Sequence, residues 1–154
     1  MVAATSCEKE DPIIDEPVVD PIITIDELQG FWSFVEWEYL GNTYTTCESV
    51  EDLYNNDYGD DPYVSVILYN LEFEKYYEYD AIYISNYCSS NNYSTPIFYT
   101  MDTATNTIIL DEDGINLRFQ VLEYDEENEI IRLKQLTHQH GYSYPQSIIT
   151  VQKQ

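Results

Sequence analysis

Two groups of side chains in this sequence are of types that bind metal ions. His138 and His140 would share one face of a strand, a spacing that can bind zinc, but no third ligand lies near them in the sequence. Asp57, Asp60 and Asp61 offer oxygen ligands for calcium, but they lack the spacing of an EF-hand loop. We therefore expect solvent-exposed histidines and no metal or other cofactor.

Motifs for catalysis are absent from the sequence. It has no Gly-x-Ser-x-Gly, no phosphate-binding glycine loop and no Cys-x-x-Cys. Pairs of carboxylates such as Glu36 and Glu38 occur, but a chain this acidic contains many such pairs by composition alone. The sequence therefore predicts a protein that is not an enzyme.

Tyrosine is the residue type that most favours a binding function, and the chain has 16 of them. Tyr79 and Tyr83 share one face of an expected strand, and Ile82 lies on the other. If the tyrosines point inward, they join Trp37 and Tyr69 in lining a cavity for a polar or aromatic ligand. If the isoleucine points inward, the tyrosines form an external patch that suits a partner or a sugar. A third alternative is that tyrosine serves only as a β-former with a solvated hydroxyl.

The charge balance limits the classes of partner. The formal net charge is −23, from 29 acidic and 6 basic side chains. A field of that sign repels the phosphates of nucleic acids and disfavours contact with anionic lipid surfaces. We therefore exclude nucleic acid as a partner, whereas neutral and cationic ligands remain compatible with the chain.

The N-terminal residues resemble the end of a bacterial lipoprotein signal peptide. A run of apolar or small residues, 1–6, ends at Cys7, and Glu8 and Lys9 follow at once. In that family the cysteine is the first mature residue and carries the lipid, which implies that residues 1–7 are a remnant of the signal. The alternative is an ordinary disordered tail that contains a cysteine.

Lipidation of Cys7 would account for the odd number of cysteines, which is three. Cys47 and Cys88 lie at the ends of expected strands, where they could form a disulfide in an oxidising compartment; the alternative is two separate thiols. Residues 8–23 contain three prolines and six acidic residues, so we expect a disordered, extended tether to a domain at residues 24–154.

From residue 24 onward the pattern is that of antiparallel strands joined by short turns. Hairpin loops at 102–106, 111–114 and 125–128 force neighbouring strands to run antiparallel. This pattern predicts an all-β, antiparallel up-and-down barrel of about eight strands, which would avoid exposed sheet edges. A two-sheet sandwich is the structural alternative. The expected strands are 31–40, 43–46, 67–74, 79–87, 97–101, 107–110, 115–124, 129–137 and 146–151.

The start of the first long strand resembles that of lipocalin-like domains. Gly30-Phe31-Trp32 is similar to the Gly-x-Trp of that family and precedes a β meander. The resemblance implies that Gly30 lets the chain turn into the barrel and that Trp32 plugs its closed end. It also implies a basic residue late in the barrel that packs on the tryptophan, for which Arg132 and Lys134 are the candidates.

The first strand changes phase along its length. Trp32 and Phe34 share one face, whereas Val35, Trp37 and Tyr39 share the other. A bulge near residues 34–36 would reconcile the two sets. The C-terminal helix of vertebrate-type lipocalins is missing from the sequence.

These expectations give two hypotheses of function. The first is a lipid-anchored, lipocalin-like lipoprotein of the bacterial outer membrane, facing the periplasm or the cell surface. It would hold a small molecule or a glycan in the barrel mouth, with residues 47–63 as a lid. The second is a filled barrel with a structural or interaction role, whose surface tyrosines contact a protein or a glycan. In both cases we expect a monomer that touches the membrane only through its anchor.

Overall fold

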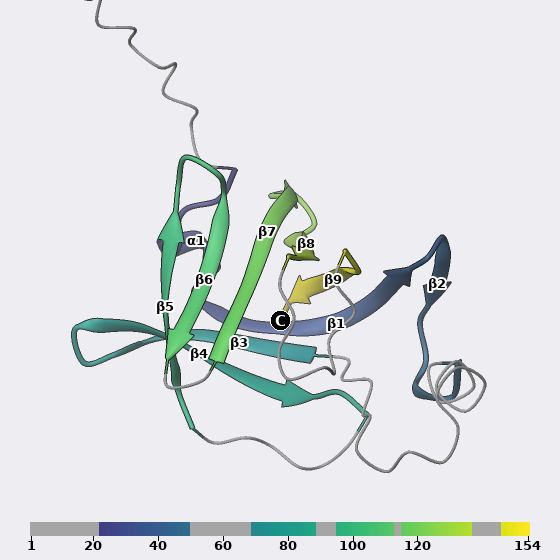
Figure 1. Ribbon diagram of the computed structural model, residues 1–154, viewed down its shortest axis with the longest axis horizontal. Coiled ribbons are helices and arrows are strands. Elements are labelled where there is room, and N and C mark those ends of the chain that lie inside the picture. Colours follow the sequence, from purple (N-terminus) through teal and green to yellow (C-terminus); the bar gives the residue numbers. More distant parts are fainter. Residues whose placement is uncertain (1–21, 50–68, 89–94, 113–114, 137–145) are drawn as a thin grey trace, which may run out of the picture.

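The computed structural model in Figure 1 describes residues 22–49, 69–88, 95–112, 115–136 and 146–154. These residues form one short helix and nine antiparallel strands. They are α1 (Ile25–Leu28), β1 (Gly30–Tyr39), β2 (Asn42–Tyr44), β3 (Tyr69–Tyr76), β4 (Tyr79–Asn86), β5 (Ile97–Asp102), β6 (Thr107–Glu112), β7 (Ile115–Asp125), β8 (Ile130–Gln135) and β9 (Ile148–Lys153). Within this part of the chain, no helix has the length and apolar character needed to cross a membrane.

The strands close into a barrel. Each strand from β3 to β9 pairs with its neighbour in sequence, β3 also pairs with β1, and β9 returns to pair with β1. The closing ladder runs from the pair Trp32–Lys153 to the pair Glu38–Ile148. Eight strands thus form the barrel, and β2 is an extra strand on the edge of β1 (Figure 1). The prediction of an antiparallel up-and-down barrel of about eight strands is confirmed.

A bulge in β1 lets this strand face the core along its whole length. The register between β1 and β9 shifts between Phe34 and Glu36, as the change of phase in the sequence predicts. Phe34 and Trp37 are consequently both buried, at 6% and 5% exposure, whereas Val35 between them is turned outward at 38%. Both halves of the strand therefore present aromatic side chains to the interior.

Antiparallel pairing divides the connections between two ends. The turns that join β3 to β4, β5 to β6, and β7 to β8 lie at the end where α1 enters β1. We call this the closed end. The opposite end, where β1 ends and β3 begins, is the mouth end.

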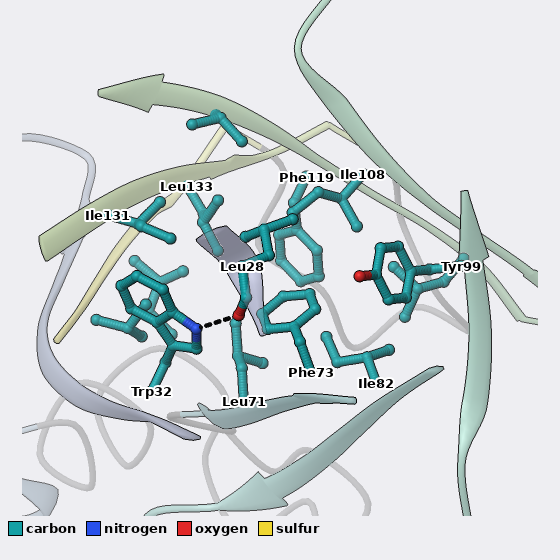
Figure 2. Close-up of a cluster of buried hydrophobic side chains, with 14 of the residues drawn as sticks. Leu28, Trp32, Leu71, Phe73, Ile82, Tyr99, Ile108, Phe119, Ile131 and Leu133 are labelled. Atoms are coloured by element: carbon teal, nitrogen blue, oxygen red, sulfur yellow. Dashed lines mark hydrogen bonds between the residues drawn. The ribbon is translucent and has the colours of Figure 1, made fainter. Parts of the chain in front are cut away.

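Apolar side chains fill the closed end around α1. Leu28 projects from the helix into the barrel, where it meets Trp32 and the rings of Phe73 and Phe119 (Figure 2). All four side chains are at most 1% exposed. The Nε1–H of Trp32 donates a 2.7 Å hydrogen bond to the carbonyl oxygen of Leu28, so the buried indole has its polar group satisfied. Burial of each such side chain stabilises the fold by roughly 1.5–3 kcal/mol.

The basic residue that covers Trp32 is Lys153. Its Nζ lies 5.3 Å from the centre of the indole ring and donates a 2.9 Å hydrogen bond to the carbonyl oxygen of Glu27. The expectation of Arg132 or Lys134 in this position is wrong, because both alternate with the inward residues of β8 and so face outward. Arg132 pairs instead with Glu38 at 2.6 Å.

Gly30 is the position where a side chain would disturb this closed end most. Its φ is +121°, and an added Cβ would lie 3.0 Å from Cε of Lys153. We expect Gly30→Ala to lower the free energy of unfolding by about 2–3 kcal/mol, because the backbone is strained and the Lys153 side chain that covers Trp32 must shift to make room. Urea unfolding followed by tryptophan fluorescence measures this difference.

Gly41→Ala is the matched control. Gly41 also has a positive φ, +80°, but nothing lies within 4 Å of its added Cβ. The substitution should cost about 1 kcal/mol, from backbone strain alone. Equal losses for the two variants would contradict a packing role for Gly30.

The helix cap predicts a pH dependence of stability. Thr24 donates to Oε2 of Glu27 from its hydroxyl at 2.6 Å and from its N–H at 2.7 Å. These bonds hold the pKa of Glu27 below its usual value of 4.5. The cap should therefore stabilise the fold above about pH 4.5 and lose its effect as the pH falls through the lowered pKa.

Glu27→Gln tests the cap. The free energy of unfolding of the wild type should exceed that of the variant near pH 7, and the difference should shrink toward about pH 3. Glu126→Gln, which removes an exposed carboxylate of the turn between β7 and β8, controls for the change in net charge. A difference that grows as the pH falls would refute the role of the Glu27 carboxylate in the cap.

Candidate functional site

Three aromatic rings gather at the mouth end of β1. Trp37 and Tyr39 stack with ring centres 5.3 Å apart and an interplanar angle of 11°. Tyr44 lies opposite Trp37 in the pairing of β1 with β2, and its ring centre is also 5.3 Å from the indole. Trp37 belongs to the buried core, whereas the two tyrosines are partly buried against it. We call these three residues the mouth cluster.

The turn between β1 and β2 produces this arrangement. Leu40 and Gly41 have φ of 50° and 80°, which is the left-handed backbone of the tightest hairpin turns. The chain therefore reverses at once, and Tyr44 returns directly beside Trp37. Together with the bulge, which turns Trp37 inward, this short reversal builds an aromatic wall on the inner side of the mouth end.

A second contact and a disulfide brace the same end. The ring of Phe34 lies 4.9 Å from that of Tyr87, just beyond the end of β4. The next residue, Cys88, forms a disulfide with Cys47, with the two Cα atoms 5.6 Å apart. The bridge therefore ties the segment after β2 to the end of β4, two parts of the chain separated by 41 residues.

Two of the tyrosines predicted for a ligand site lie outside the barrel. In β4, Ile82 is fully buried in the core, and Tyr79 on the opposite face is 57% exposed. The hydroxyl of Tyr83 hydrogen-bonds to Glu74, which raises the pKa of this tyrosine. This corrects the hypothesis that Tyr79 and Tyr83 line the interior, and the physical reason is that the aliphatic face of the strand is the one that packs into the core.

The other predicted binding residues have different outcomes. Trp37 lies inside the mouth end, whereas the side chain of Tyr69 is outside the described residues. Tyr39 and Tyr44, the ring partners of Trp37, were not among the predicted binding residues. Both could have been found, because Tyr39 shares the face of Trp37 and the Gly41 turn brings residue 44 opposite residue 37.

The metal hypotheses cannot be placed on the described part of the chain. Within it, no group of three His, Cys, Asp or Glu side chains could hold a metal ion. Asp57, Asp60, Asp61, His138 and His140 are outside the described residues, and so is Cys7. The candidate site therefore consists of aromatic rings rather than charged or metal-binding groups.

Loss of the disulfide should destabilise the barrel. Because the bridge closes a loop of 41 residues, Cys47→Ser combined with Cys88→Ser should lower the free energy of unfolding by about 2–4 kcal/mol. Urea unfolding with and without reductant measures the effect. Reductant should lower the free energy of unfolding of the wild type to that of the variant and leave the variant unchanged. An unchanged free energy of unfolding of the wild type in reductant would contradict a stabilising bridge.

Comparison of the chain with protein-family models, with curated proteins and with solved structures gave no match. No family can therefore be assigned from relatives. The closed antiparallel barrel rests on the strand pairing described above, and the function has to be argued from the side chains at the two ends and on the outer face.

Proposed function

We propose that this chain is a lipid-anchored lipoprotein of the bacterial envelope whose lipocalin-like barrel binds a small ring-containing ligand at its mouth. The observation that carries the proposal is the mouth cluster, in which the ring centres of Tyr39 and Tyr44 each lie 5.3 Å from that of Trp37. Aromatic rings bury large apolar areas, and the tyrosine hydroxyls can bond to polar groups of the same ligand.

Packing at the closed end limits the depth of such a site. Leu28, Trp32, Phe73 and Phe119 occupy the interior beside α1 and are fully or almost fully buried. A ligand would therefore lie near the mouth, on the side of Phe34 and the mouth cluster. The chain's net charge of −23 favours a neutral or cationic molecule over an anionic one.

The cysteines support export of the protein. A disulfide between Cys47 and Cys88 is typical of oxidising compartments such as the periplasm or the cell surface. Cys7 is then the one cysteine of the three outside this bridge, in agreement with a lipid anchor at that residue. The resemblance of residues 1–7 to a lipoprotein signal points to the same location.

Titration with the neutral fluorophore phenylnaphthylamine tests the mouth site. Wild-type protein should enhance its fluorescence, and Tyr39→Ala combined with Tyr44→Ala should raise the Kd about tenfold, since two aromatic contacts of roughly 0.7 kcal/mol each are lost. Circular dichroism confirms that the variant remains folded.

Phe31→Ala is the matched control for this titration. Phe31 is an aromatic residue on the outer face of β1, with 38% exposure, and it lies at the closed end. Its removal should leave the Kd unchanged. If the fluorophore does not bind, or binds equally well to the double variant, the mouth cluster is not a ligand site.

A second candidate function is contact with another macromolecule through surface tyrosines. It is favoured by a separate group of exposed rings at the tip of the β3–β4 hairpin, far along the barrel from the mouth end. The two functions use different side chains and do not exclude each other.

A further inference from the structure

Four exposed aromatic rings form a continuous patch at the closed end. Tyr76, Tyr77 and Tyr79 surround the turn between β3 and β4, and Phe98 comes from β5; their exposed fractions are 38%, 87%, 57% and 37%. The ring of Tyr76 lies 4.9 Å from that of Tyr77 and 6.2 Å from that of Phe98, which is in turn 5.4 Å from Tyr79. We call these residues the hairpin patch.

Strand pairing explains why the rings meet. Tyr76 pairs directly with Tyr79 across the hairpin, and Phe98 pairs with Ala81 on the neighbouring strand. Because Ile82 and Tyr99 point into the core, residues 79, 81 and 98 point outward. Ala81 itself is fully buried, so the larger side chains around it cover the sheet at this point.

The tip of the hairpin is costly for folding. Tyr77 has a φ of 57°, in a turn position that glycine or asparagine occupies with less strain, and most of its ring is in contact with water. The contacts of Tyr77 with other described residues bury little of its ring and so offset little of this strain. Strain and apolar exposure at the same residue are typical of surfaces kept for binding.

The negative charge around the hairpin patch favours a cationic ligand. The hairpin carries Glu72, Glu74 and Glu78, and its single basic residue, Lys75, is paired with Asp80 at 2.6 Å. Glu72 and Glu74 lie on the same outward face of β3 as Tyr76. A cation placed here would meet both the faces of aromatic rings and nearby carboxylates, two attractions that add.

Ring orientation separates a cation from a sugar. A sugar ring stacks on a flat aromatic surface, whereas the rings of the hairpin patch are tilted, by 90° between Tyr76 and Tyr77 and by 52° between Tyr79 and Phe98. Tilted rings offer several faces and edges around one point, which suits a guanidinium or ammonium group. We propose that the hairpin patch is a docking site for a lysine- and arginine-rich segment of a protein partner.

Fluorescence anisotropy with a labelled peptide of alternating lysine, arginine and glycine tests this proposal. Tyr77→Ser combined with Tyr79→Ser leaves the net charge unchanged and removes two rings that are mostly exposed, so the barrel should stay folded. The Kd for the peptide should rise at least about fivefold, as expected when cation–π contacts of roughly 0.5–1 kcal/mol each are lost. A peptide with glutamine in place of each basic residue should not bind the wild type.

Leu122→Ser is the matched control, because Leu122 is 36% exposed on β7 and is not part of the hairpin patch. It should leave peptide binding unchanged. Equal binding of the peptide to the wild type and the double variant would show attraction to the overall charge and overturn the proposal. The proposal would also be overturned, in favour of a glycan, if the wild type bound a neutral oligosaccharide more tightly than the double variant did, while the Kd for the peptide was the same in both. Phenylnaphthylamine binding should be the same in the double variant and the wild type, which separates this site from the mouth.

Discussion

The phase change within β1 is the constraint on which the barrel depends. This strand pairs with β3 near α1 and with β9 along most of its length, so it closes the sheet. A regular strand could point only one of its two aromatic sets inward. The bulge between Phe34 and Glu36 lets Trp32 anchor the closed end and Trp37 reach the core near the mouth. Without it, one tryptophan would have to face solvent, and one end of the barrel would lose its largest side chain.

The same strand contributes a buried tryptophan to each end of the barrel, Trp32 and Trp37. At the closed end, Lys153 covers the indole, bonds to the carbonyl oxygen of Glu27 and lies against Gly30. The C-terminal strand is thereby fixed to the helix that plugs the barrel. At the mouth end, partly buried tyrosines and a disulfide take the place of such a plug. The two ends of the barrel are thus held by different means, an apolar plug at one and a disulfide with partly buried rings at the other.

Local sequence signals predicted most of the fold. The short loops at 102–106 and 125–128, together with alternating strands between them, are sufficient to establish an antiparallel meander. The bulge was also predictable, since the change of phase left no other way to bury both halves of the strand. Barrel closure was an inference from the need to avoid free edges, and the ladder between β1 and β9 confirms it.

Contacts between distant parts of the chain could not be predicted in the same way. Lys153 rather than Arg132 covers Trp32 because the end of β9 lies beside Gly30. No local sequence pattern specifies that these two parts of the chain meet. The sequence did not show which face of β4 points into the barrel, because Tyr83 and Ile82 are both good β-formers. That depends on which side chains pack better in the core. The mouth cluster, by contrast, is local: a turn of two residues sets residue 44 beside Trp37, so the sequence contains the signal for it.

The abundance of tyrosine has more than one physical cause. Tyr99 is a core residue whose burial raises its pKa, and Tyr83 fits the simple explanation of a β-former whose hydroxyl is hydrogen-bonded. Neither explanation covers Tyr77, which is in a turn, has a left-handed backbone and is 87% exposed. β-propensity does not apply there, and solubility would favour a polar residue. Such a ring is the kind of surface that a binding partner covers, and the carboxylates around it favour positive charge at that point.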